Sequence, residues 1–143
     1  MASSKRRNFK TIFTIVIVGL LAITITVGFI SNWINTNNRL SIIKEPGDIQ
    51  KVEVKVVSDA GIKSSLITDS SKLDMINTAL KQAQEIKGRT ARVSEIWSDL
   101  LIYKNNKKVN LRIQHSIYNG WVIIIGNKTF NSNYMFRLVE AYK

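Results

Sequence analysis

His115 is the only imidazole in this chain of 143 residues, and the chain has no cysteine. A metal site needs several ligands brought together, and neither a second histidine nor a thiolate is present to complete one. Glu95 and Asp99 stand four residues apart near Trp97, where they could form an acidic pair or be ordinary solvated carboxylates. The chain also has no G-x-S-x-G frame for a serine nucleophile and no glycine-rich phosphate loop. The sequence therefore predicts no catalytic residue, no metal site and no cofactor.

Basic residues dominate the charge of the chain. Lysine and arginine number 21 against 10 aspartates and glutamates, which gives a formal net charge of +11. The absence of cysteine excludes a disulfide framework and a lipid-modified cysteine anchor. A chain of this length can form one small folded domain, and its positive charge would attract anionic polymers or lipid headgroups.

A long uncharged stretch near the start, TIFTIVIVGLLAITITVGFI over residues 11–30, has the length and composition of a membrane span. Twenty helical residues extend about 30 Å, the thickness of the hydrocarbon core of a bilayer. Trp33 follows where an interfacial aromatic side chain is expected. A cleaved signal peptide is the alternative, but its apolar region has only about 7 to 15 residues and ends at a small-residue cleavage site. We expect a retained anchor over residues 11–34.

The charges on the two sides of the span predict its orientation. Four basic residues precede it: Lys5, Arg6, Arg7 and Lys10. Residues 31–50 contain only Arg39 and Lys44. The positive-inside rule then predicts a cytoplasmic basic tail over residues 1–10, a linker over 35–47 that ends in Pro46-Gly47, and an extracytoplasmic domain over 48–143. Thr24 and Gly28 lie four residues apart, a spacing that favours a weak homodimer through the span or simply places small residues toward lipid.

The first half of the domain has one strand pair and one helix. Alternating valines over 49–57 predict a strand with one buried face, and Asp59-Ala60-Gly61 leads into a second strand over 62–68. A helix begins near Asp69, Ser70 or Ser71, with Asp74 as the partner of a capping box, and Gly88 ends it. Its expected core stripe is Leu73, Ile76, Ala79, Leu80 and Ala83. Residues 89–99 are either a loop or an irregular edge strand.

The second half predicts an antiparallel meander. Four β-type runs over 100–103, 108–118, 121–125 and 128–130 are separated by Asn105-Asn106, Asn119-Gly120 and Gly126-Asn127. A short helix over 132–142 closes the chain, with Tyr134, Leu138, Met135 and Tyr142 expected to face inward. The predicted fold class is α+β: a transmembrane helix, two strands, a helix, a four-strand meander and a C-terminal helix.

The register of the Asn119-Gly120 hairpin decides which side chains share a face. A two-residue loop would pair Tyr118 with Trp121 and His115 with Ile124. The helix-covered face would then carry Val109, Leu111, Ile113, His115, Ile117, Val122 and Ile124, with His115 as a buried, hydrogen-bonded histidine. The opposite face would carry Arg112, Gln114, Ser116, Tyr118, Trp121, Ile123, Ile125 and Phe130. That face is too apolar for open solvent, so either a second layer covers it or it is a partner-binding patch of Arg112, Tyr118, Trp121, Ile123 and Phe130.

Three lysines flank the Asn105-Asn106 turn: Lys104, Lys107 and Lys108. They are either solvated residues of an exposed turn or a contact for an anionic wall polymer or phospholipid headgroups. Nucleic acid is not an expected partner, because the domain should lie outside the cytoplasm.

Three segments, "IKSSLITDSSKLDMINTAL", "SDLLIYKNNKKVNLRI" and "WVIIIGNKTFNSNYMFRLVEAY", occur in an order that resembles small envelope-attached domains of Gram-positive bacteria. The resemblance covers residues 62–142 and implies an α+β fold in the cell envelope. We expect a single-pass membrane-anchored binding or accessory protein without enzymatic activity, whose partner is an envelope protein or an anionic wall polymer. The alternative is an immunity or exclusion protein that protects the membrane against a toxin or phage, and an enzyme on wall polymer would require Glu95 and Asp99 to line a cleft.

Overall fold

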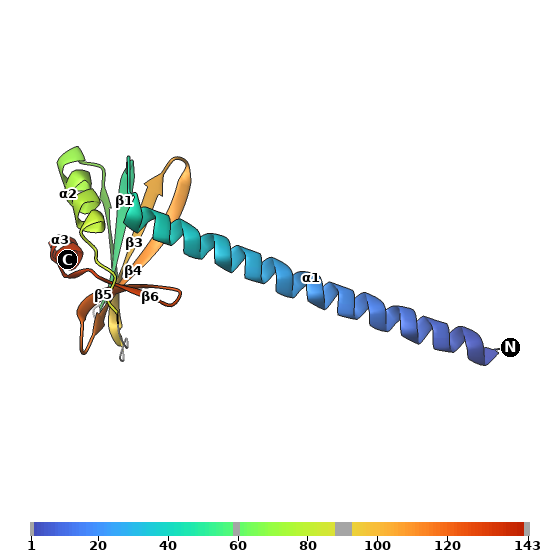
Figure 1. The fold of residues 1–143 in the computed structure, drawn as a ribbon. Helices are drawn as coiled ribbons and strands as arrows, with labels where there is room; N and C mark the ends of the chain where they lie inside the picture. The colour runs from blue at the N-terminus through green and yellow to red at the C-terminus, as the bar shows by residue number, and fades with distance from the viewer. Residues whose placement is uncertain (1, 59–60, 88–92, 142–143) are drawn as a thin grey trace. The chain divides into compact units, whose positions relative to one another are not determined.

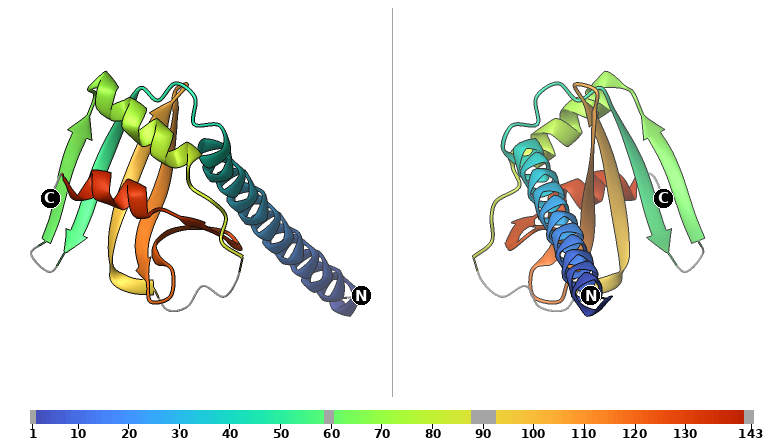
Figure 2. Two further views of the ribbon diagram at one scale, coloured as in Figure 1. Left: turned by 60° about the vertical axis from the view of Figure 1, so that its left-hand side comes forward. Right: turned by 90° about the vertical axis from the view of Figure 1, so that its right-hand side faces the viewer.

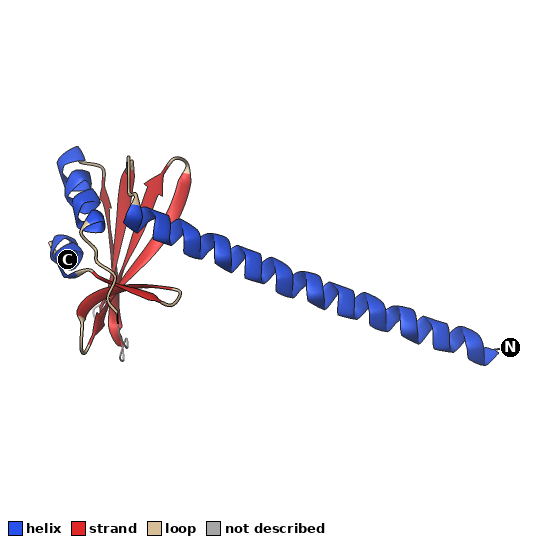
Figure 3. Cartoon of the chain, in the orientation of Figure 1, coloured by secondary structure: helices blue, strands red, loops and turns tan. Residues whose placement is uncertain are grey.

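The computed structural model describes residues 2–58, 61–87 and 93–141, with side chains for 11–57, 61–87, 93 and 97–141. Its elements, in chain order, are helix α1 (Ala2–Lys44), strands β1 (Lys51–Ser58) and β2 (Gly61–Ile67), helix α2 (Ser70–Lys81), strands β3 (Val93–Lys104), β4 (Lys107–Ser116), β5 (Gly120–Ile125) and β6 (Lys128–Asn131), and helix α3 (Asn133–Glu140) (Figures 1 and 3). The chain divides into two compact units, residues 1–35 and 36–143. The α+β class expected from the sequence is confirmed.

The first unit consists of helix α1 up to residue 35. Residues 11–35 are exposed along all sides of the helix, and the best window has a mean hydropathy of 2.6. Two threonines in this stretch are satisfied within the helix, because the hydroxyls of Thr24 and Thr26 donate to the carbonyls of Leu20 and Ala22, both at 2.8 Å. Among the described residues, this helix is long and apolar enough to cross a bilayer, as the composition predicts.

The second unit is built on one antiparallel sheet with the strand order β2-β1-β3-β4-β5-β6. Both views of Figure 2 place α2 and α3 on the same side of this sheet. The register puts Val54, Leu100 and Leu111 next to one another on the helix-covered face, and each is at most 1% exposed. The alternation of valines in β1 therefore buries one face, as expected.

The two helices supply the other half of the core. Helix α2 buries Leu73, Ile76, Ala79 and Leu80, which confirms four positions of the expected stripe, and Ala83 packs against the core from just beyond the helix end. Asp69 is the N-cap, since its carboxylate accepts hydrogen bonds from the Ser71 hydroxyl at 2.6 Å and the Lys72 N–H at 3.0 Å.

Helix α3 differs in part from the expectation. It buries Met135, Phe136 and Val139, whereas Tyr134 is 45% exposed and Leu138 is half-buried. The prediction that Tyr134 faces inward is wrong, because the helix turns the Met135, Phe136 and Val139 side toward the sheet. Tyr142 lies outside the described residues.

The expected linker over 35–47 is helical up to Lys44. Ile42 and Ile43 are 3% and 4% exposed and belong to the core, so the end of α1 packs against the domain in place of forming a flexible connection. The chain leaves the helix through Pro46, and the Lys104 amine donates to the Glu45 carbonyl at 2.8 Å. A cation near the last carbonyls of a helix stabilises its end.

Two of the three predicted hairpin turns have the expected length. Asn105 and Asn106 have φ values of 48° and 59° in a two-residue turn that pairs Lys104 with Lys107. Gly126 and Asn127 form the second two-residue turn, so Phe130 pairs with Ile123 as expected. Strand β3 lies between β1 and β4 from Trp97 onward, so residues 97–99 are neither loop nor edge strand. The pairing with β1 ends at Trp97 and the register with β4 shifts between Val93 and Trp97, so an irregular edge strand describes residues 93–96. Residues 89–92 lie outside the described part.

The predicted register of the β4–β5 hairpin is wrong. The turn takes three residues, 117–119, so that Ser116 pairs with Gly120 and His115 with Trp121. This change turns β5 over relative to β4, and it places Trp121, Ile123 and Ile125 on the helix-covered face, where Ile123 and Ile125 are each 1% exposed. The observed register packs the larger side chains against the helices and places Val122, itself 0% exposed, and Ile124 on the opposite face, so apolar area is buried on both sides of β5.

Candidate binding surface

The face of the sheet opposite α2 and α3, called the open face below, carries an ordered set of polar and aromatic side chains. Its central residues are Lys51, Glu53 and Lys55 of β1, Trp97, Asp99, Leu101 and Tyr103 of β3, and Lys108, Asn110, Arg112 and Gln114 of β4. The edge strand β2 adds Ile62, Ser64 and Leu66. The end of α1 packs with the helix-covered core. On the opposite face Val122 of β5 and Leu101 of β3 are 0% and 7% exposed, so the candidate binding surface is the part over β1, β3 and β4 where the polar and aromatic side chains lie.

Arg112 is held at the centre of the open face by two neighbours on β3. Its guanidinium makes a bidentate contact with Asp99, with Nε–Oδ1 at 2.8 Å and Nη2–Oδ2 at 3.1 Å, and lies over the Trp97 ring at 4.8 Å from the ring centroid. The hydrogen bond to Asp99 raises the pKa of Arg112 against the opposing effect of partial burial, so the group stays charged. The three side chains form one ordered unit, in which the Arg112 side chain is 46% exposed.

A second unit surrounds Tyr103. The amines of Lys51 and Lys108 lie over its ring, 4.5 Å and 5.5 Å from the centroid, and its hydroxyl donates to Glu53 at 3.4 Å. Desolvation works to raise the pKa of the Glu53 carboxyl. Hydrogen bonds from Lys55 and Ser64, and the charges of Lys55 and Lys108, outweigh this effect and hold that pKa below its ordinary value. The ring thus gathers two cations beside one ionised carboxylate.

The five residues of the expected partner-binding patch do not form one surface. Ile123 and Phe130 are buried in the core, and the Trp121 ring is half-buried against Phe136 of α3. Tyr118 is 79% exposed in the β4–β5 turn, and Arg112 lies on the open face. Of the two alternatives, the structure shows cover for the Trp121 side, because the three-residue turn reverses β5.

The three lysines around the Asn105-Asn106 turn also separate. Side chains alternate across a strand, so Lys104 and Lys107, which pair with each other, point to the helix-covered side and Lys108 points to the open face. Lys104 and Lys107 line a polar cavity of about 200 Å³ together with Asn38 and Ser41 of α1. The Lys104 amine is engaged with the Glu45 carbonyl, which gives it a structural role at the end of α1.

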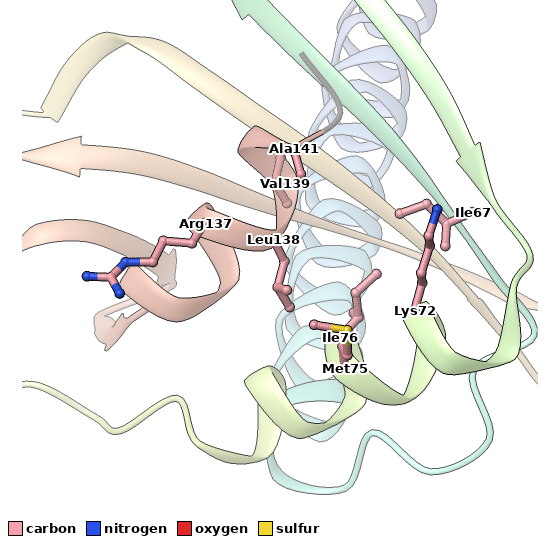
Figure 4. Close-up of a pocket in the computed structure, with 8 residues that line it drawn as sticks. All are labelled: Ile67, Lys72, Met75, Ile76, Arg137, Leu138, Val139 and Ala141. Carbon is pink, nitrogen blue, oxygen red and sulfur yellow. The ribbon is translucent and has the colours of Figure 1, made fainter.

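A second cavity, of about 220 Å³, lies between α2 and α3. Its lining is mostly apolar: Ile67, Met75, Ile76, Leu138, Val139 and Ala141, with Lys72 and Arg137 as the basic members. Figure 4 shows Met75, Ile76 and Leu138 at the centre of the groove and the Arg137 guanidinium directed away from them. The Arg137 guanidinium thus does not converge with the apolar lining on one ligand position.

Among the described side chains, those with catalytic potential do not assemble into a site. His115 lies on the helix-covered face and meets the Trp121 ring edge-on, with centroids 5.2 Å apart. Asp99 is paired with Arg112, and the Glu95 side chain lies outside the described residues. Among the residues that the structure describes, no group of three or more His, Asp or Glu side chains could hold a metal ion. Comparisons with family models, with curated proteins and with solved structures found no match to this chain.

The open face does not follow from the predicted strands, because residues 89–99 were expected to be either a loop or an irregular edge strand. A signal was present: Trp97, Asp99, Leu101 and Tyr103 occupy every second position, which is the period of one strand face. Continuing the strand back from Tyr103 would have placed Trp97 and Asp99 beside Arg112 across the Asn105-Asn106 hairpin.

Proposed function

We propose that this chain is a single-pass membrane protein of the bacterial cell envelope, whose extracytoplasmic domain binds a phosphate-bearing polyanion on the open face of its sheet and carries out no catalysis. The observation that supports this proposal is the packing of the helices against one face only. It leaves a surface on which cations and aromatic rings are held in place by their neighbours.

The unit around Tyr103 has the chemistry to bind phosphate groups. The ring holds the amines of Lys51 and Lys108 close together, and each ammonium group has three N–H donors, so contact with the ring leaves donors for a ligand. Arg112 and Lys55 add two more cations on the same face, against the carboxylates of Glu53 and Asp99. The excess of positive charge favours a polymer of repeated phosphates, which can contact several cations at once.

The charges around α1 support the orientation in this proposal. Lys5, Arg6, Arg7 and Lys10 precede the span, whereas Arg39 and Lys44 are the basic residues soon after it. A retained anchor in this orientation would present the domain to the cell wall, where anionic polymers are found.

The test uses full-length protein in nanodiscs of zwitterionic lipid and measures the affinity for poly(glycerol phosphate), with uncharged dextran as the control polymer. Lys108→Glu and Lys51→Glu should each weaken binding by about thirty-fold, because one basic residue near an anionic surface contributes about 1 kcal/mol and charge reversal counts twice. Affinity should also fall with added salt.

Lys107→Glu is the matched control, since it makes the same charge change one residue away from Lys108 but on the helix-covered side. It should leave most of the affinity intact. Equal losses for Lys107→Glu and Lys108→Glu would mean that net charge, and not the open face, governs binding. The absence of any binding to the polymer would overturn the proposal.

A further inference from the structure

The two edges of the sheet differ in whether another segment of the chain covers them. The β6 edge is covered by the chain after α2: the Ile86 N–H donates to the Thr129 carbonyl at 2.7 Å, and the Asn131 N–H donates to the Gln84 carbonyl at 2.9 Å. An ion pair of Lys128 with Glu85, at 2.7 Å, reinforces this cover. At the opposite edge, β2 has only β1 as a neighbouring strand among the described residues, and Figure 2 shows it at the outer margin of the sheet in both views.

The ladder defines which backbone groups of β2 point outward. In an antiparallel sheet, each residue directs its N–H and C=O toward one neighbouring strand, and the direction alternates along the chain. The two-residue turn makes Lys104 and Lys107 a hydrogen-bonded pair. Following the register from there through β3 and β1, the odd-numbered residues of β2 face β1. The backbone groups of Ile62, Ser64 and Leu66 therefore point away from the sheet.

These same three residues place their side chains on the open face. Ile62 and Leu66 are 72% and 61% exposed, which is unusual for two large aliphatic side chains on one short strand. An uncovered edge with exposed aliphatic side chains is a surface on which another strand can pair.

We infer that β2 pairs with β2 of a second copy of this chain, antiparallel and centred on Ser64, to form one continuous sheet across the dimer. In this register, Ser64 lies opposite Ser64 of the second copy, and Ile62 lies opposite Leu66 of the second copy at both ends. All three outward-facing residues of each strand then form hydrogen-bonded pairs. The two aliphatic pairs cover each other, which removes their exposed area from water.

The strand is complementary to itself, and this favours a second copy over an unrelated peptide. Lys63, the only charged residue of β2, would lie opposite Ser65 of the second copy, so no like charges face each other. Centring the pair on Lys63 or Ser65 would instead place an aliphatic residue opposite Ser64 and leave one outward-facing residue at an end. A single strand pair is a small interface, and anchoring both copies in one bilayer would raise their effective concentration. The pairing does not depend on what the open face binds.

Disulfide formation in membranes tests the register. The chain has no cysteine, so Ser64→Cys introduces the only thiol. Hydrogen-bonded residues in an antiparallel pair have Cα atoms about 5.5 Å apart, within the range of about 4.4 to 6.8 Å that a disulfide spans. Under mild oxidation, full-length Ser64→Cys should form dimers at several times the yield of Ile117→Cys, a matched control that is 67% exposed in the β4–β5 turn. Equal yields would overturn the inference.

Proline substitution provides the second test, because proline has no N–H. The N–H of Ser64 points away from the sheet, whereas the N–H of Lys63 donates a hydrogen bond to β1. Ser64→Pro should keep the fold, as edge strands tolerate proline at an outward-facing N–H, while Lys63→Pro should lower the melting temperature. Ser64→Pro should weaken the dimer by about tenfold or more, since it removes two main-chain hydrogen bonds from the symmetric pair.

Ile62→Lys with Leu66→Lys keeps the test decisive if Ser64→Pro fails to fold, because both positions are exposed. The double variant should be monomeric by sedimentation in detergent. Dimers that persist in both variants but are lost in Gly28→Leu would assign association to the membrane helix and overturn the pairing through β2. An unrelated peptide as the partner would give monomers of the wild-type protein in every assay, which would also overturn it.

Discussion

The ring of Trp121 lies parallel to the ring of Phe136, with an interplanar angle of 7° and centroids 3.5 Å apart. This stack joins β5 to α3, and His115 on β4 meets the same indole edge-on. The contact anchors the C-terminal helix to the sheet through aromatic packing.

Replacing Trp121 with alanine should therefore lower stability, because it leaves a cavity under α3 and removes the stack. We expect a loss of about 2 kcal/mol or more, measured by scanning calorimetry of the full-length protein in detergent. Tyr118→Ala is the control, since that side chain is 79% exposed and its loss should change stability by less than about 0.5 kcal/mol. Unchanged melting of Trp121→Ala would show that the stack contributes nothing to the fold.

The second prediction concerns the contribution of the Asn105-Asn106 turn to stability. Both residues have positive φ, a conformation that asparagine and glycine adopt readily and β-branched residues do not. Asn106→Val should destabilise the domain by about 1 to 2 kcal/mol, whereas Asn106→Gly should be neutral or stabilising. Calorimetry of the two variants checks this, and equal melting temperatures would contradict the assigned turn.

The N-cap of α2 should give a pH-dependent contribution to stability. The hydrogen bond from Ser71, followed by that from the Lys72 N–H, lowers the pKa of Asp69 in the folded protein. Because the folded pKa is depressed, the contribution is complete above the unfolded value and is lost as the pH falls through the folded pKa. At neutral pH, Asp69→Ala should lower the melting temperature by a few degrees, while Asp69→Asn, which can still cap, should stay close to wild type.

Between pH 7 and pH 3, the wild-type protein should lose more stability than Asp69→Asn. The two proteins share every other carboxylate, and at position 69 the aspartate titrates whereas the asparagine does not. If the melting temperatures of the two proteins fell by equal amounts between pH 7 and pH 3, the Asp69 carboxylate would contribute nothing beyond what an amide supplies.

The orientation of the anchor can be tested with the cysteine-free background. Ile117→Cys in intact cells should react with a membrane-impermeant maleimide, because the proposed topology exposes that turn outside. Changing Lys5, Arg6, Arg7 and Lys10 together to glutamate should reverse the topology, so that labelling requires permeabilised cells. Loss of an N-terminal tag from the mature protein would instead indicate cleavage of the apolar segment.

Local patterns predicted much of the fold, since they depend on residues close in the chain. The apolar length of residues 11–30, the valines of β1, the stripe Leu73–Leu80 and the Asn105-Asn106 turn each specify a local structure by their spacing. Each of these elements is present in the structure where the sequence placed it.

Tertiary packing determines which side chains of β5 face the helices, and it determines where α1 ends. Asn119-Gly120 favours a two-residue turn, but a three-residue turn brings Trp121 onto Phe136 and buries Ile123, and that apolar contact outweighs the local preference. Ile42 and Ile43 stand in a polar, asparagine-rich segment, and only the neighbouring sheet provides a core that makes a helix favourable there. The open face likewise exists because α2 and α3 pack on the same side of the sheet, through contacts between residues far apart in the chain.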